Sequence, residues 1–143
     1  MESSLHDQDY NLWLEQMAIA LRNQDIERMD WENLVAEIED MGASQKRALR
    51  SYMYRLIEHI FKLQYWEQER KRNSNNWRIE VANFRNEINS ILEDSPSLKN
   101  YLSDHYLDWY QKSVNKLDKS GAFAIPDHQA IDLPTILNDD FFG

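Results

Sequence analysis

Residues 30–42 read DWENLVAEIEDMG, and this stretch carries the signals of one complete helix. Asp30 is placed to cap the free N–H groups of the first turn, and Gly42 can adopt the left-handed conformation that ends many helices. Between them, apolar residues recur at helical spacing and share one face: Trp31, Leu34, Val35, Ile38 and Met41. We therefore predict a helix that ends at Gly42 and packs this face on the next helix along the chain.

That next helix is predicted to begin at Ser44, a residue that can cap it, and to extend to about Trp66. It is the longest periodic segment of the chain, and we predict that it is the core helix. Its apolar stripe has nearly heptad spacing and consists of Leu49, Tyr52, Met53, Leu56, Ile60 and Leu63.

Helices are also predicted on both sides of this central pair. Apolar periodicity predicts a first helix from about Asp7 to Arg22, followed by a short helical turn across residues 25–29. Residues 67–76 contain no apolar side chain, so we predict a connection there. A fourth helix is expected from about Asn76 to Glu93.

The fifth helix is predicted to begin at Ser95-Pro96, with Ser95 as its cap, and to extend to about Leu117. Its aromatic residues spread over more than one face, which favours cover by the C-terminal arm or a partner interface. These residues are Tyr101, Tyr106, Trp109 and Tyr110.

The C-terminal segment is predicted to be an extended arm over residues 122–130, followed by a short helix. Asp132 can cap that helix, from Leu133 to about Asn138, and Pro134 is tolerated in its first turn. The apolar residues of this end should dock on the bundle. The predicted fold is an all-α, single-domain bundle of about five helices, residues 1–143, plus this arm and short helix.

Length and composition limit the classes of function. A chain of 143 residues fits one domain, and the absence of cysteine excludes disulfides, thiolate zinc sites and cysteine nucleophiles. No segment approaches the length of a membrane span, and the first seven residues do not resemble a signal peptide. We therefore expect a cytoplasmic protein without membrane segments.

The charge is unevenly distributed along the chain. The net charge is −9, but Lys46 to Arg72 carries eight basic and three acidic residues, a local charge of +5. Such asymmetry can indicate an anionic partner. We favour the alternative, in which helices of opposite sign pack together within the fold or across a dimer.

The sequence resembles the DUF29 family, a bacterial family common in cyanobacteria. The most specific carriers are the segment Ile38 to Gly42, the later His59 and Lys62, and the Ser-Pro-Ser-Leu run of residues 95–98. The resemblance covers nearly the whole chain. It implies a helical bundle and implies no activity, since the family is one of unknown function. The sequence departs from many relatives after Tyr65, where Trp66-Glu67 replaces a Gln-Pro turn.

One group of residues is a candidate metal or acid–base site. Glu37 and Asp40 are three residues apart, as metal ligands on one helix often are, and His59 could join them from the core helix. The favoured alternative is that these acids form ion pairs with Arg47, Arg50, Arg55 or Lys62, and that His59 is a packed residue with one hydrogen bond. If His59 is functional, Glu37 or Glu39 is its expected partner.

A second candidate is a nucleic-acid site. Arg70, Lys71 and Arg72 could contact phosphates while Trp77 stacks on a base. The acidic net charge and the place of Trp77 in an apolar stripe argue against this reading. Two functions remain open: an interaction or regulatory module, which we favour, binding a protein partner or forming a homo-oligomer, and an enzyme using Glu37, Asp40 and His59. No cofactor is predicted.

Overall fold

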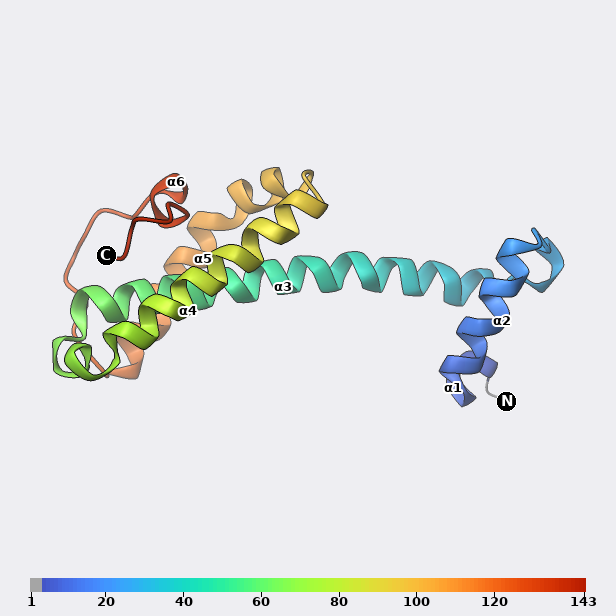
Figure 1. The fold of residues 1–143 in the computed structure, drawn as a ribbon, viewed down its shortest axis with the longest axis horizontal. Coiled ribbons are helices and arrows are strands. Elements are labelled where there is room, and N and C mark those ends of the chain that lie inside the picture. The colour runs from blue at the N-terminus through green and yellow to red at the C-terminus, as the bar shows by residue number, and fades with distance from the viewer. Residues whose placement is uncertain (1–3) are drawn as a thin grey trace. The chain divides into compact units, whose positions relative to one another are not determined.

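The computed structural model describes residues 4–143, and it confirms the all-α class. Within those residues there are six α-helices, one 3-10 helix and no strand (Figure 1). In chain order they are α1 (Leu5–Gln8), α2 (Tyr10–Arg22), η1 (Ile26–Arg28), α3 (Trp31–Tyr65), α4 (Glu67–Asp94), α5 (Leu98–Ser120) and α6 (Leu133–Ile136). The predicted short turn across residues 25–29 is confirmed by η1.

The chain forms two compact units, Met1–Ser44 and Gln45–Gly143, which we call the N-terminal and C-terminal units. α3 begins in the first unit and ends in the second. The N-terminal unit has a small core, which consists of Trp13, Met17 and Ala20 on α2. The C-terminal unit has a larger core, to which α3, α4, α5 and α6 contribute. The single domain expected from length stays a prediction.

The predicted helix end at Gly42 is wrong, because α3 continues through this position to Tyr65. Gly42 has no positive φ, and Ser44 lies inside the helix and caps nothing. A single glycine costs a helix only about 1 kcal/mol relative to alanine, and neighbouring residues that form helices well can supply that. Two segments of one continuous helix cannot face each other. The predicted packing of the Trp31–Met41 face on the Leu49–Leu63 stripe is therefore wrong as well.

The connection predicted over residues 67–76 is also helical. The chain turns at Trp66 alone, and α4 begins at Glu67. This segment consists mostly of Glu, Gln, Arg, Lys and Asn, and the first four of these residue types form helices well even when they are solvated. The absence of apolar residues therefore did not indicate a loop, and the predicted connection is wrong.

Two other helix starts differ from the predictions. Asp9 interrupts the first predicted helix, since its carboxylate caps α2 by accepting a 3.1 Å hydrogen bond from the Leu12 N–H. α5 begins at Leu98, with Ser97 as the N-cap residue, so Ser95 is not its cap. Ser95 instead ends α4, and its hydroxyl donates a 3.1 Å hydrogen bond to Gln45.

The C-terminal arm docks on the C-terminal unit, as predicted. Asp132 caps α6 by accepting a 2.9 Å hydrogen bond from the Thr135 N–H, and Ile136 is fully buried. The arm also covers part of the aromatic α5: the Tyr106 hydroxyl donates to the Ile131 carbonyl at 2.6 Å, and the Tyr110 hydroxyl bonds to His128 at 2.7 Å.

Arg85 on α4 holds the segment that follows this arm, residues 136–141. The residue is 1% exposed, and its guanidinium donates to the carbonyls of Ile136, at 2.9 and 3.0 Å, and of Phe141, at 2.5 Å. A longer bond of 3.5 Å goes to the carbonyl of Asp139. Burial lowers the pKa of Arg85, and the negative charge of Asp139 opposes that change.

Candidate functional site

The N-terminal unit exposes an unusual amount of apolar surface. Twelve large apolar side chains are exposed among the described residues, and ten of them lie between Tyr10 and Met41. The other two, Ile79 and Leu107, lie far apart in the sequence of the C-terminal unit. Soluble proteins seldom gather exposed apolar side chains in this way unless the surface binds something.

Four of these side chains form what we call the α3 face: Trp31, Val35, Ile38 and Met41, which are 59%, 52%, 66% and 66% exposed. Their spacing of three or four residues places them along one side of the helix. The sequence identified this apolar stripe correctly, and the structure shows that the N-terminal unit leaves it uncovered.

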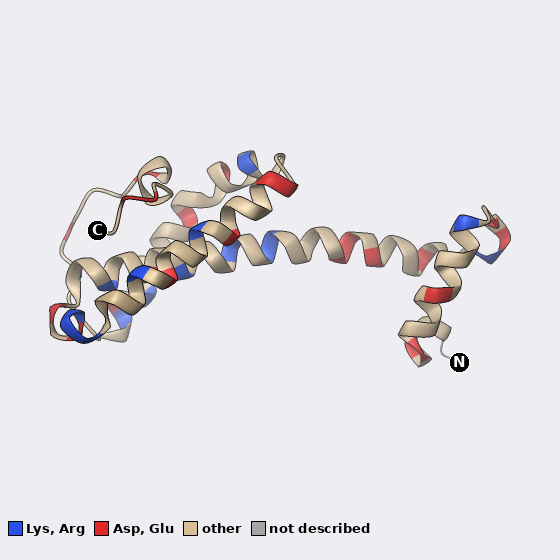
Figure 2. Ribbon diagram, in the orientation of Figure 1, with Lys and Arg blue, Asp and Glu red and all other residues tan. Residues whose placement is uncertain are grey.

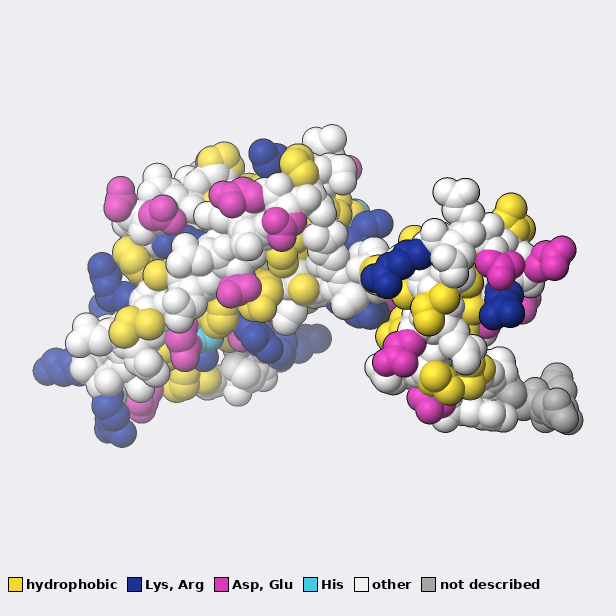
Figure 3. Space-filling view, turned by 45° about the vertical axis from the view of Figure 1, so that its right-hand side comes forward, with side chains coloured by type: hydrophobic (Ala, Val, Ile, Leu, Met, Phe, Trp, Pro, Cys, Tyr) yellow, Lys and Arg dark blue, Asp and Glu magenta, His cyan; other side chains and the backbone are white. Residues whose placement is uncertain are grey.

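α2 adds exposed apolar residues on either side of its buried stripe. Leu14 and Leu21 lie on one flank, and Leu12 and Ile19 on the other. Beside the second flank is a hollow of about 360 Å³ whose lining includes Met17, Ile19 and Ala20, with polar groups from Asn23 to Arg28. Figure 3 shows apolar side chains gathered on the unit that carries the grey residues 1–3, with acidic side chains among them.

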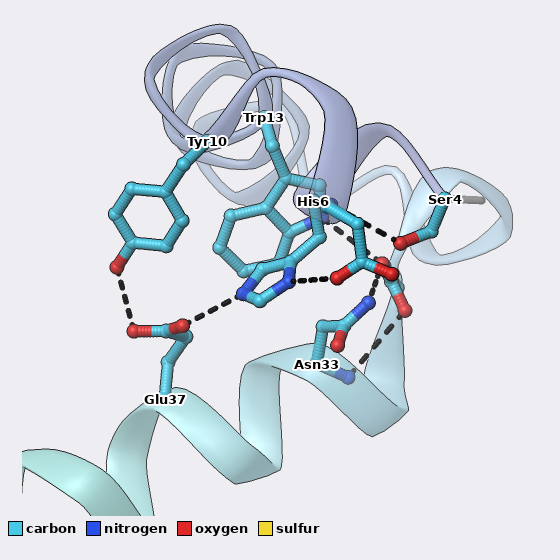
Figure 4. A network of polar contacts seen from close by, with 8 residues as sticks. Ser4, His6, Tyr10, Trp13, Asn33 and Glu37 are labelled. Carbon is cyan, nitrogen blue, oxygen red and sulfur yellow. Dashed lines mark hydrogen bonds and ion pairs between the residues drawn. The ribbon is translucent and has the colours of Figure 1, made fainter.

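A hydrogen-bond network holds α1 and α2 against the first turns of α3 (Figure 4). Glu37 accepts a 2.6 Å bond from the Tyr10 hydroxyl, and it pairs at 2.7 Å with Nε2 of His6. The other ring nitrogen of His6, Nδ1, lies 3.3 Å from a carboxylate oxygen of Asp7. Both ring nitrogens therefore face carboxylates, an arrangement that the doubly protonated imidazolium satisfies.

Asp30 is the second centre of this network. It caps α3 as predicted, through a 3.5 Å bond from the Asn33 N–H, and also accepts 2.7 Å and 3.0 Å bonds from the Asn33 amide and the Trp13 indole. The His6 ring packs edge-on against Trp13, with centroids 4.7 Å apart. This polar network compensates for the small apolar core of the unit.

The network shifts the pKa values of its members in opposite directions. The bond to Glu37 raises the pKa of His6 above its usual value, with a smaller contribution from Asp7. The hydrogen bonds from Tyr10 and then His6 lower the pKa of Glu37. The Asn33 side chain and the Trp13 indole lower the pKa of Asp30, against the opposing effect of burial. Each shift favours the charged form that makes the bonds.

Charge separates the two units sharply. Residues 1–44 contain eleven acidic and two basic residues, a net charge of −9, whereas residues 45–143 contain fourteen of each and are neutral overall. Figure 2 shows acidic residues along the part of α3 that follows α2 in the chain, and basic residues further along the same helix. The whole net charge of the protein therefore lies on the unit that exposes the apolar residues.

Two residues of the predicted metal or acid–base site, Glu37 and His59, have separate partners. Glu37 bonds to His6 and Tyr10, and His59 pairs with Glu80 while its Nδ1 donates a 2.8 Å bond to the Arg55 carbonyl. Glu37 belongs to the N-terminal unit and His59 to the C-terminal unit. Asp40 is exposed. Among residues 4–143, no group of three His, Asp or Glu side chains is placed to hold a metal.

The acids of residues 30–42 do not pair with the predicted cations. Glu37 takes its ion pair from His6, and the described residues include no ion pair from Glu39 or Asp40 to Arg47, Arg50, Arg55 or Lys62.

The basic residues considered for nucleic acid lie at the start of α4. Arg70 donates a 2.8 Å bond to the Gln64 carbonyl, and Lys71 and Arg72 are exposed. Trp77 is 7% exposed and stacks on Trp66, with centroids 5.9 Å apart. Its ring belongs to the core, as its place in the apolar stripe indicated, and has no free face for a base.

The sequence analysis did not identify the role of His6 and Tyr10. His6 and Tyr10 are separated from Glu37 by about thirty positions, and no periodicity connects them. The available signal was the capping pattern of Asp9, which divides the first helix and turns α1 back toward α3. A histidine partner for Glu37 was considered only as the alternative in which His59 is functional, whereas the histidine that pairs with Glu37 is His6.

Comparison with known proteins gives one match. The family model described as "Domain of unknown function DUF29" matches residues 5–142. Searches of the curated proteins and of the solved structures returned no match. In the described part of the chain, no helix has the length and apolar character needed to cross a membrane.

Proposed function

We propose that this chain, which belongs to the DUF29 family of unknown function, is a helical interaction module whose N-terminal unit binds another protein through the α3 face. The observation that carries the proposal is the concentration of exposed large apolar side chains between Tyr10 and Met41. The C-terminal unit, by contrast, exposes only Ile79 and Leu107 among its large apolar residues, and the others are buried or partly buried.

The energetics support a surface made for binding. Full burial of a side chain such as Val, Ile or Met contributes about 1.5–3 kcal/mol, and Trp31 offers the largest area on this face. Such anchors, spaced three or four residues apart on one helix, are typical of helix-mediated recognition. We further propose that the module acts in the cytoplasm, which suits a chain without cysteine.

The test is site-specific photocrosslinking in the cells that make the protein. A photoreactive amino acid replaces Val35 or Ile38 on the α3 face, and Ile79 or Leu107 in matched controls. The controls are 60% and 65% exposed, close to the 52% and 66% of the two test positions.

We expect a discrete protein adduct from Val35 and Ile38 that is absent from both control positions. Mass spectrometry then identifies the partner. Adducts of equal pattern at all four positions, or none at the α3 face, would overturn the proposal.

A further inference from the structure

The α3 face specifies the shape of its partner. Trp31, Val35, Ile38 and Met41 are all more than half exposed, and they extend over about 15 Å of helix. A second helix laid along such a stripe presents apolar residues at the matching spacing of three and four. The shape therefore fits a partner helix of about three turns or more.

The edge of the face specifies the charge of that partner. Glu32 and Glu39 are neighbours of Val35, three residues before it and four after it, so both lie along one side of the α3 face. Both are exposed, and neither has a partner among the described residues. With a net charge of −9 on residues 1–44, the surface attracts a cationic partner and repels an anionic one.

A second copy of the chain fits this surface poorly. Two N-terminal units would each bring a charge of −9. The basic residues Lys46 to Arg72 could supply opposite charge, but no large apolar side chain within that segment is exposed. In a second copy, the N-terminal unit has exposed apolar residues but a negative charge. The segment Lys46 to Arg72 has a positive charge but no exposed large apolar residue. Nucleic acids and anionic membranes are disfavoured by charge alone.

We propose that the N-terminal unit binds a basic amphipathic helix of another protein. The apolar side of that helix packs on Trp31, Val35 and Ile38, and its lysine or arginine residues face Glu32 and Glu39. This inference rests on the proposed function and adds the chemical class of the partner.

The test uses the full chain and three labelled helical peptides, with binding followed by fluorescence anisotropy. The first peptide has leucines on one face and lysines elsewhere, the second has glutamates in place of the lysines, and the third has the leucines and lysines of the first in scrambled order. We expect the first peptide to bind at least about tenfold more tightly than the other two, with an affinity that falls as salt is raised.

Two pairs of variants locate the binding. Val35→Ser with Ile38→Ser should weaken binding of the lysine peptide about tenfold or more, whereas Ile79→Ser with Leu107→Ser should not change it. Glu32→Gln with Glu39→Gln should weaken binding and flatten its salt dependence, whereas the exposed acids Glu87 and Glu93 on α4 serve as controls when changed to Gln.

The outcomes separate this inference from the proposed function. Equal binding of lysine and glutamate peptides, lost in the Val35/Ile38 variant, would overturn the basic partner and leave the docking face standing. No binding of the lysine peptide, or binding that ignores the Val35/Ile38 variant, would overturn the inference. A crosslink from Ile38 to a second copy of the chain would overturn it too, while supporting an interaction module.

Discussion

The indole N–H of Trp13 donates a 3.0 Å hydrogen bond to Oδ2 of Asp30, the residue that also caps α3. Trp13 is 2% exposed and is the largest residue in the core of the N-terminal unit. One carboxylate therefore fixes the start of α3 and satisfies the only polar atom of the buried indole. This link keeps α2 and α3 in place around a core too small to do so alone.

Replacing Asp30 should destabilise the N-terminal unit selectively. Asp30→Ala removes the helix cap and leaves the Trp13 N–H without its acceptor, and each loss costs about 1 kcal/mol or more. Hydrogen exchange should show faster exchange of α2 amides by a factor of about thirty, with α4 and α5 unchanged. Asp40→Ala, at an exposed position of the same helix, is the control and should change exchange little. Equal effects of the two variants would contradict the prediction.

The His6–Glu37 pair should make docking of α1 depend on pH. The pKa of His6 is raised above its ordinary value of 6.5. The stability that His6 contributes to docking is therefore fully present below pH 6.5 and is lost as pH rises through the raised pKa. The pKa of Glu37 is lowered from 4.5, so its contribution is fully present above pH 4.5 and is lost as pH falls through the lowered pKa. Docking should therefore be strongest between these two ordinary values.

NMR titration of the histidine rings, with hydrogen exchange of α2, measures this dependence. His6→Gln should remove the loss of protection on the alkaline side. His105→Gln, at an exposed histidine that bonds only to the Tyr101 carbonyl of its own helix, should leave it unchanged. An alkaline loss that survives His6→Gln would show that another group controls the docking.

Gly42→Ala should stabilise the protein. Gly42 lies inside α3 without a positive φ, and an added Cβ meets no atom within 4 Å. Alanine should therefore raise the free energy of unfolding by up to about 1 kcal/mol, as measured by urea denaturation. If the helix ended at Gly42 in the left-handed conformation, the same change would destabilise the protein, because alanine is strained there. Gly121→Ala provides that comparison, because Gly121 ends α5 with φ of 68° and alanine there is strained.

Arg85→Lys should release the C-terminal arm although it preserves the positive charge. Lysine cannot reproduce the bonds from one guanidinium to the Ile136, Asp139 and Phe141 carbonyls, and buried carbonyls left without donors cost about 1–3 kcal/mol each. Limited proteolysis should then cut within residues 122–132 more readily. Arg78→Lys is the control, since Arg78 is exposed and stacks on Phe142, 3.9 Å from the ring centroid. Unchanged cleavage in Arg85→Lys would contradict the anchoring role.

Helix content was predictable wherever apolar periodicity or a capping residue marked it. Asp30 and Asp132 cap the helices that their positions indicated, and Trp77 lies in the core. Helix ends were less predictable, because a glycine such as Gly42 permits a break without requiring one. The polar start of α4 was missed for a related reason: apolar periodicity detects packed helices and is silent about solvated ones.

The sequence predicted one part of the candidate site, the apolar stripe, but not its exposure or the partners of Glu37. The apolar stripe of residues 31–41 could be read directly, but its exposure could not, since exposure depends on whether the helix stops at Gly42. The partners of Glu37 were hidden because His6 and Tyr10 reach it only after Asp9 divides the first helix.

The sequence by itself determined the all-α class, the composition of each apolar face and the concentration of acidic charge in residues 1–44. These properties follow from local periodicity and from counting, so they need no knowledge of what packs on what. Only the tertiary structure decided that α3 continues past Gly42, that His6 pairs with Glu37, and that the face from Trp31 to Met41 stays exposed. Those outcomes depend on contacts between residues far apart in the sequence. Small differences in free energy at a few positions determine which of the alternative arrangements forms.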